Sequence, residues 1–244
     1  MNRSTAIRLI QDVAGQKNAF DGLENALSSI PKTELNSALL ECGIIPEQFE
    51  HDSSEEELWA KYCDILFAHT LSYLSIPAEV LRTRGDSADI LGKTDHYSIV
   101  GDAKAFRLSR SAKNQKDFKI KALDDWRRSD TYACLVAPLY QYPTRESQIY
   151  QQALEHNVTL ISYVHLSFLL DHFAGQNLKP LWEIGKHLQP GKNARLYWQT
   201  IDEVVCETIG ASEAALKAYK HEEVSRTKLI GEEGIAYWEP SITT

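Results

Sequence analysis

The amino-acid sequence predicts an α/β fold, in which a β-sheet carries helices on its faces and helical regions flank it at both ends of the chain. Two apolar runs, residues 132–137 and 158–163, are typical of strands that a sheet buries on both faces. Segments with helical periodicity alternate with them, which favours a sheet covered by helices. We therefore expect a helical N-terminal region over residues 1–76, a sheet core over residues 77–175 and a helical C-terminal region over residues 176–244.

The N-terminal region contains three predicted helices with apolar stripes. Ser4, Thr33 and Ser54 are candidate capping residues for helices that reach about residues 14, 42 and 73. Gly43 is expected to stop the second helix, and Pro77 follows the third. Three glutamates fill the first turn of the third helix, where negative charge suits the helix dipole.

The core region begins with a predicted hairpin. Residues 88–91 and 97–106 are expected to form antiparallel strands joined by a tight turn at residues 93–96. Further helices are predicted after the hairpin and after each buried strand, at residues 117–128, 146–155, 166–173, 193–209 and 212–237. Strand and helix thus alternate through the core, and the remainder of the chain is helical.

The composition is that of a soluble globular protein. Of 244 residues, 43% are hydrophobic and 25% are charged, and no run is long and apolar enough to cross a bilayer. The N-terminus also lacks an apolar signal core. Because the cysteines are widely spaced and form no C-x-x-C pair, we expect reduced thiols and a cytoplasmic protein without a membrane partner; they are Cys42, Cys63, Cys134 and Cys206.

The charge is unevenly distributed along the chain. The formal net charge is −8, but residues 101–121 carry seven basic and two acidic residues, a local charge of +5 that leaves −13 for the rest. A basic patch on an acidic body suits a site with local contacts to nucleic-acid phosphates. The alternative is a solvated basic loop with no ligand.

Three charged residues of the predicted hairpin form a candidate catalytic cluster. Asp102 and Lys104 are two residues apart on a strand, so their side chains project from the same face. Asp89, in the neighbouring strand, can bring a second carboxylate to the same place. Paired carboxylates hold a hard cation such as Mg²⁺, and an ammonium beside them can polarise water or stabilise charge on a phosphate. The alternative is a solvent-facing ion pair between Asp102 and Lys104.

The residues around this cluster resemble HindIII-like type II restriction endonucleases, a family of the PD-(D/E)XK nuclease superfamily. The spacing of Asp102 and Lys104, with Asp89 upstream, is similar to the signature of the superfamily. The resemblance to the family lies chiefly in the stretches 102–119 and 137–144. It implies a nuclease core built on a mixed β-sheet, whose hairpin presents the catalytic groups.

The resemblance also implies an activity and partners. Asp89 and Asp102 would be ligands of Mg²⁺, and Lys104 would orient the attacking water. The substrate would be double-stranded DNA with the palindromic site AAGCTT, which calls for a homodimer that contacts one half-site per subunit. A cognate DNA methyltransferase would be encoded separately.

The polar segment that follows the catalytic strand is the predicted DNA-binding segment. Arginine can bind guanine, asparagine can bind adenine, a small apolar side chain can touch the thymine methyl group, and lysine can bind phosphate. The candidate DNA-binding residues are Arg107, Arg110, Ala112, Lys113, Asn114, Lys116 and Lys119. A flexible polar loop is the alternative, and proximity to the catalytic cluster favours binding.

Two further acids are secondary candidates for the catalytic cluster. Asp117 and Lys119 repeat the Asp-x-Lys spacing, but at a predicted helix start, where residues i and i+2 do not share a face. Glu79 lies upstream of the hairpin and could supply another carboxylate. At Arg82 the family has a glutamate, so we assign no metal-binding role to that position.

Two alternative functions remain open from the sequence. A PD-(D/E)XK nuclease of DNA repair or branched-DNA resolution would use the same catalytic cluster without a sequence preference. A DNA-binding protein with a degenerate site would have no activity at all. Intact Asp89, Asp102 and Lys104 argue against the second of these.

Overall fold

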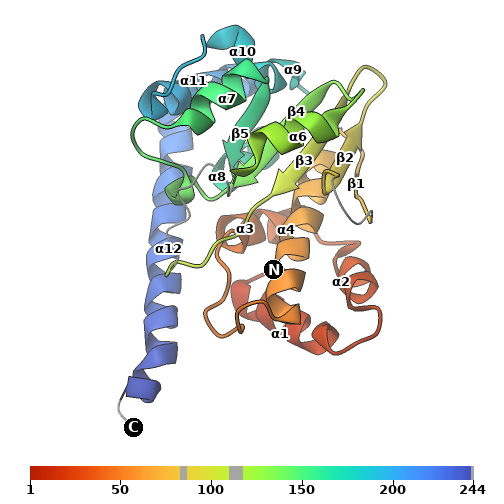
Figure 1. Cartoon of the computed structure of the whole chain (residues 1–244), viewed down its shortest axis with the longest axis vertical. Helices are drawn as coiled ribbons and strands as arrows, with labels where there is room; N and C mark the ends of the chain where they lie inside the picture. The colour runs from red at the N-terminus through yellow and green to blue at the C-terminus, as the bar shows by residue number, and fades with distance from the viewer. Residues whose placement is uncertain (83–86, 110–117, 243–244) are drawn as a thin grey trace.

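The computed structural model describes residues 1–82, 87–109 and 118–242. It has an α/β fold in which one five-stranded sheet stands beside helical N-terminal and C-terminal segments (Figure 1). Within the described residues, no helix combines the length and the apolar character that a membrane span requires.

The sheet is mixed, as the sequence predicts. Its strands lie side by side in chain order: β1 (Ala78–Val80), β2 (Ile90–Lys93), β3 (Ser98–Ala103), β4 (Tyr132–Ala137) and β5 (Val158–Ser162). The first three strands pair antiparallel and the last three parallel. The predicted hairpin is therefore confirmed as β2 and β3, with the turn closed by a hydrogen bond from the Thr94 amide to the Tyr97 carbonyl.

Two crossover helices connect the parallel strands. α6 (Ile120–Arg127) joins β3 to β4, and α7 (Gln148–Glu155) joins β4 to β5. Both connections step across the sheet in the same direction, and right-handed crossovers then place their helices on one face. The two helices lie together in front of the sheet in Figure 1.

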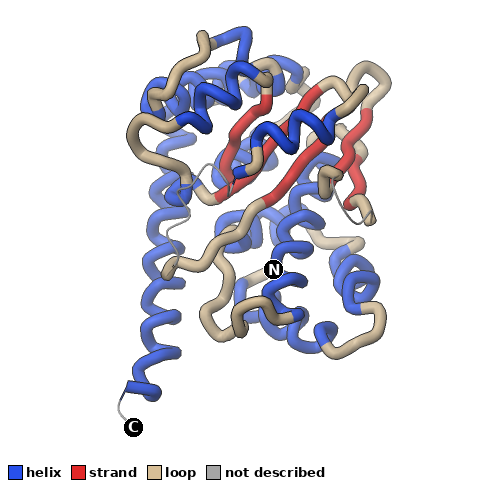
Figure 2. The backbone as a smooth tube through the Cα atoms, in the orientation of Figure 1, coloured by secondary structure: helices blue, strands red, loops and turns tan. Residues whose placement is uncertain are grey.

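The remaining helices are arranged around the sheet. In the N-terminal segment they are α1 (Arg3–Ala14), α2 (Ala19–Leu27), α3 (Lys32–Cys42) and α4 (Ser54–Tyr73). After β5 they are α8 (Tyr163–His172), α9 (Lys179–Trp182), α10 (Ile184–His187), α11 (Ala194–Ile209) and α12 (Glu213–Ile242), with a 3₁₀ turn at Leu139–Gln141 before α7. Figure 2 shows how the long helix α12 extends beyond the sheet layer along the N-terminal helices.

The predicted helix starts differ from the observed ones in their capping residues. The Asn2 side chain, not that of Ser4, accepts a hydrogen bond at the start of α1, and Ser53 rather than Ser54 caps α4. Gly43 does follow α3, but with an ordinary right-handed φ of −65°. Its role is close approach: a Cβ there would lie 2.5 Å from the ring of Pro138.

Some elements are absent from the prediction and others are shorter than predicted. Helix α2 and the edge strand β1 are too short to show a clear hydrophobic periodicity, so the sequence did not predict them. Strand β3 ends at Ala103, and α6 begins only at Ile120 because Lys119 adopts a left-handed conformation, φ 45°. The four cysteines are free thiols, as expected.

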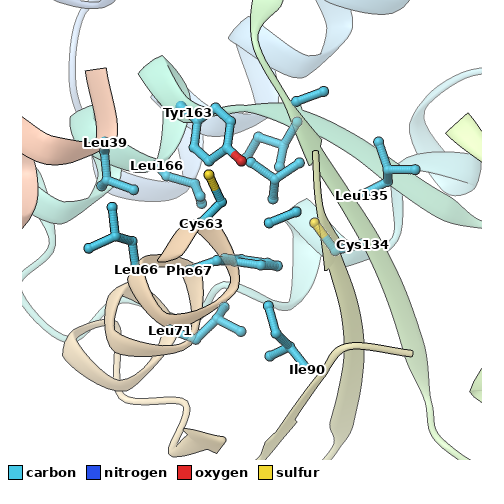
Figure 3. Close-up of a cluster of buried hydrophobic side chains, with 14 of the residues drawn as sticks. Leu39, Cys63, Leu66, Phe67, Leu71, Ile90, Cys134, Leu135, Tyr163 and Leu166 are labelled. Carbon is cyan, nitrogen blue, oxygen red and sulfur yellow. The ribbon is translucent and has the colours of Figure 1, made fainter. Parts of the chain in front are cut away.

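Helix α4 is the main support of the sheet on its N-terminal side. Figure 3 shows its side chains Cys63, Leu66, Phe67 and Leu71 among residues of the strands and of α8. The edge of the Phe67 ring reaches the backbone of β3 at Gly101, where a Cβ atom would come within 2.6 Å of the ring. A glycine at this point therefore sets how closely α4 approaches β3.

We predict that Gly101→Ala lowers the stability of the protein. The added methyl group collides with Phe67, and overpacking in a dense core typically costs about 1–3 kcal/mol. Denaturant unfolding would measure the effect, with Gly191→Ala as the control because a Cβ there would make only an ordinary contact, 3.8 Å from the Gln189 carbonyl oxygen. Equal stability of the two variants would contradict this account of the contact.

Candidate active site

Three aspartates from three segments of the chain meet at one end of the hairpin. Asp64, Asp89 and Asp102 each offer a carboxylate oxygen, and these oxygens lie within 4.8 Å of one another. The structure thus brings together the two predicted carboxylates, Asp89 and Asp102. It adds Asp64, which the sequence analysis missed.

The local fold explains why these side chains meet. In the ladder between β2 and β3, Ile90 pairs with Gly101, and the Asp89 amide donates a hydrogen bond to the Gly101 carbonyl at 3.2 Å. This register places Asp89 beside Asp102. Asp64 stands one turn before Phe67 on α4, so the close packing of Phe67 on Gly101 delivers its carboxylate to the same place.

Asp102 is the most deeply buried member of the cluster. Its exposed fraction is 1%, and among the described residues neither carboxylate oxygen has a hydrogen bond of good geometry. The Lys104 ammonium lies 2.5 Å from one of these oxygens and forms an ion pair with it. Burial raises the pKa of Asp102, although Lys104 opposes the shift. A buried carboxylate with open acceptor positions is costly unless a charged partner completes it.

This donor set fits a hard divalent cation. All three candidate ligands are carboxylate oxygens, the ligand type that Mg²⁺ and Ca²⁺ select. One carboxylate oxygen of Asp102 lies within 4.8 Å of oxygens of Asp64 and Asp89, which gives the cation a place to bind. The chemistry of the residues therefore agrees with a metal site.

Lys104 is held firmly next to this site. Its amide donates to the Val136 carbonyl on β4 at 2.8 Å, and its carbonyl accepts from the Tyr163 hydroxyl at 3.0 Å. Its side chain remains 23% exposed. The backbone is thus fixed by two neighbouring elements while the ammonium stays accessible to a substrate.

Lys61 is a second lysine in the cluster, and the sequence analysis missed it too. Its ammonium lies 2.9 Å from Asp64 and 2.6 Å from Asp89. Burial lowers the pKa of Lys61, but the two carboxylates outweigh burial and raise it. At neutral pH this side chain is therefore a cation inside the carboxylate cluster.

Burial raises the pKa of Asp64 to about 8, and the nearby charge of Asp89 adds to this effect. In the unfolded chain an aspartate ionises near pH 4, so between about pH 4 and pH 8 the folded state holds a proton that the unfolded state has lost. We predict that the stability of the metal-free protein falls as pH rises through this window. The slope has an upper limit of about 1.4 kcal/mol per pH unit.

Urea unfolding of the metal-free protein at pH 5, 6, 7 and 8 would measure this dependence. Asp64→Asn removes the group, so the variant should lose this contribution to the slope and gain relative stability at pH 8. Asp125→Asn, in which an aspartate of α6 outside the cluster is replaced, should keep the slope of the unmodified protein. An identical pH dependence in the Asp64→Asn variant would contradict the raised pKa.

Arg107 occupies a different environment from the one predicted for a DNA-binding residue. Its guanidinium is buried and donates to the backbone carbonyls of Pro46, Phe49 and Glu50, and it pairs with Glu56. These contacts tie the segment after β3 to the segment before α4. They favour a structural role for Arg107.

Lys119 lies close enough to the carboxylate cluster to influence it electrostatically. It is exposed at the start of α6, and its charge helps to lower the pKa of Asp102 against the effect of burial. The neighbouring Phe118 is fully buried and stacks on Tyr142 at 5.0 Å. Arg107 and Phe118 therefore anchor the chain on either side of the predicted DNA-binding segment.

Among the described residues, Glu79 is a predicted site residue that is not brought into the cluster, and Arg82 also lies apart from it. Glu79 is exposed on the edge strand β1, and Arg82 pairs with Asp21 and Glu24 of the N-terminal segment. Six residues lie outside the described residues: Arg110, Ala112, Lys113, Asn114, Lys116 and Asp117.

A buried serine and histidine and a half-buried aspartate elsewhere resemble a nucleophilic triad only in composition. Ser162 contacts His165 at 2.6 Å, and His165 contacts Asp202 at 2.8 Å. Ser162 and His165 are fully buried, and the pair forms the capping box of α8. Lys220 completes the network by pairing with Asp202, so these residues fasten α8 to α11 and α12.

A sequence signal for Asp64 did exist. It is an acid inside an otherwise apolar stretch of a predicted helix, from Tyr62 to Phe67, and acids are almost never fully buried without a partner. This signal marks a residue for attention but does not identify its partner, because Asp89 lies 25 residues away in sequence.

Two comparisons with known proteins bear on the family of the chain. The model of the HindIII restriction endonuclease family matches residues 5–242. Over 168 residues the chain is 42% identical to the type II restriction enzyme HindIII of Haemophilus influenzae (strain ATCC 51907 / DSM 11121 / KW20 / Rd). That alignment covers 67% of this chain and 56% of the Haemophilus enzyme, so the chain spans little more than half the length of the relative.

Proposed function

Because the chain belongs to the HindIII restriction endonuclease family, we propose that it is a type II restriction endonuclease that cleaves both strands of a palindromic duplex. The observation that carries the proposal is the buried carboxylate of Asp102, with open acceptor positions, among Asp64, Asp89 and Lys104. Buried charge clusters often contribute no more stability than apolar packing of the same volume, so stability alone does not account for this one.

In this proposal Asp64, Asp89 and Asp102 hold a divalent cation, with Mg²⁺ as the proposed ion. When bound, the cation supplies Lewis-acid stabilisation of the charge that develops on the phosphate. Lys104, anchored by β4 and by Tyr163, orients the attacking water and stabilises the same charge. The expected products carry a 5′-phosphate and a 3′-hydroxyl.

For recognition we propose the segment between Arg107 and Lys119, which follows the catalytic strand directly. The family membership supports AAGCTT as the proposed site. A palindromic site is matched by a two-fold homodimer with one half-site per subunit. Self-protection of the host DNA would require a methyltransferase of the same specificity.

Digestion of mapped plasmid DNA in the presence of Mg²⁺, followed by sequencing of the cut ends, tests the proposal. Cleavage confined to AAGCTT is the expected result. Cleavage without sequence preference, or only at branched DNA, would indicate a nuclease of repair or resolution. Binding without any cleavage would indicate a DNA-binding protein.

Base recognition and phosphate contact predict different responses to substitution. Asn114→Ala should lose discrimination at one base pair per half-site, because a bidentate base contact is worth about 1–3 kcal/mol. Lys119→Ala should instead weaken binding to all sequences and flatten the salt dependence. The measurement is binding to AAGCTT and to single-substitution duplexes at two salt concentrations. If Asn114→Ala weakens binding to every duplex equally, Asn114 does not contact a base.

A further inference from the structure

We propose that Lys61 is a built-in counter-ion of the metal site, which the divalent cation must displace, and that Lys61 thereby sets the affinity for the metal. This inference rests on the proposed function, because it needs the three carboxylates to bind a metal. The mechanism proposed above gives Lys61 no role in catalysis.

The Lys61 ammonium lies among the proposed metal ligands. Lys61 Nζ lies 2.9 Å from an Asp64 oxygen and 2.6 Å from an Asp89 oxygen. Oxygens of these same two carboxylates lie within 4.8 Å of one another and of Asp102. The ammonium therefore contacts two of the three proposed metal ligands at once, and a cation bound by them would have to share or take its place.

The charge of the cluster changes when a metal binds. Three aspartates stand against two lysines, Lys61 and Lys104. Without a metal, Lys61 is the counter-ion of Asp89 and donates a hydrogen bond to Asp64. When a divalent cation binds, the three carboxylates are balanced by the cation and Lys104 alone, so Lys61 becomes a surplus positive charge that repels the metal.

The structure has room for the displaced Lys61 side chain. Lys61 is 36% exposed, and it lines an open groove of about 820 Å³ between α4 and the start of α2. Glu57 lies four residues earlier on α4 and lines the same groove. A glutamate and a lysine at this spacing share a helix face, so Lys61 can exchange Asp64 and Asp89 for Glu57.

Titration calorimetry of Mg²⁺ into the metal-free protein, without DNA, tests the inference. Lys61→Met keeps most of the length of the side chain and removes its charge, and should bind Mg²⁺ at least ten times more tightly. Lys61→Arg keeps the charge with a fork that pairs better with carboxylates, and should bind Mg²⁺ more weakly. The control is Lys17→Met, a lysine of the same groove, which should bind Mg²⁺ like the unmodified protein.

Thermal unfolding gives a second, independent measurement. In EDTA, Lys61→Met should unfold at a lower temperature than the unmodified protein, because Asp89 loses its counter-ion and Asp64 loses a hydrogen-bond donor. Mg²⁺ should raise its unfolding temperature more than it raises that of the unmodified protein.

The outcomes separate the inference from the proposed function. If Mg²⁺ binds the unmodified protein and Lys61→Met binds it equally or more weakly, Lys61 positions the ligands and the inference is wrong, while the metal site stands. If neither protein binds Mg²⁺ by either measurement, with or without duplex DNA, both the inference and the metal-dependent function are wrong. Tighter binding by Lys61→Met together with weaker binding by Lys61→Arg supports the inference.

Discussion

Replacement of Asp102 by asparagine should abolish DNA cleavage and leave DNA binding intact or stronger. The substitution keeps the size of the side chain but removes the negative charge at the most buried position of the cluster. An amide cannot balance a divalent cation as a carboxylate does, so the proposed metal site fails. Removal of a negative charge beside the phosphate does not disfavour the duplex.

The substitution should not unfold the protein. Asp102 is buried with open acceptor positions and a pKa raised by burial, so the native state carries a charge that is costly to keep there. A neutral amide removes this cost, although it also leaves Lys104 without its partner. We therefore expect a folded variant, which circular dichroism and thermal unfolding would verify before activity is compared.

Plasmid cleavage and duplex binding, measured on the same preparations, check the prediction for Asp102→Asn. The matched control is Asp95→Asn, an exposed aspartate in the turn of the same hairpin, which should cleave like the unmodified protein. The same loss of cleavage should follow addition of EDTA to the unmodified protein. Full-rate cleavage by Asp102→Asn would remove this residue from the catalytic site.

The hairpin could be predicted from the sequence because its determinants are local. Alternation and apolar runs define β2, β3 and the two buried strands, and the turn between the hairpin strands lies among polar residues. Once the hairpin is placed, the proximity of Asp89 and Asp102 follows from strand register alone. The same local argument puts Lys104 on the side of Asp102, where the structure has it.

Asp64 and Lys61 could not be assigned from the sequence because their positions depend on how a helix packs on a sheet. The contact that brings α4 to β3 is a phenylalanine ring against a glycine, Phe67 on Gly101, 34 residues apart in the chain. A sequence pattern shows which face of α4 is apolar but not which strand it meets. The third carboxylate and its counter-ion therefore appear only in the folded structure.

For Arg107 the prediction failed for a different reason. The residue type and its position suit a DNA contact, but in the structure the guanidinium binds other groups of the protein. Arginine beside a catalytic strand is a reasonable DNA contact, but the carbonyls of Pro46, Phe49 and Glu50 are arranged to accept its guanidinium. Those carbonyls belong to a loop about 60 residues earlier. A backbone acceptor has no sequence signature, so the competition between these carbonyls and DNA could not be foreseen.

Lys104→Ala should reduce the rate of cleavage on the order of 10²-fold or more, which is the typical cost of a lost, preorganised group that stabilises the transition state. The ammonium has two features that favour this role: an ion pair with Asp102 and a backbone held by β4 and Tyr163. Lys104→Arg should not restore the full rate, because the planar guanidinium differs in reach and shape from an ammonium. Single-turnover cleavage separates this effect from changes in DNA binding.

Lys93→Ala, an exposed lysine at the far end of the same hairpin, is the matched control and should cleave normally. Near-normal rates for both Lys104 variants would mean that the lysine serves only to neutralise Asp102, and the orientation of the water would then need another group.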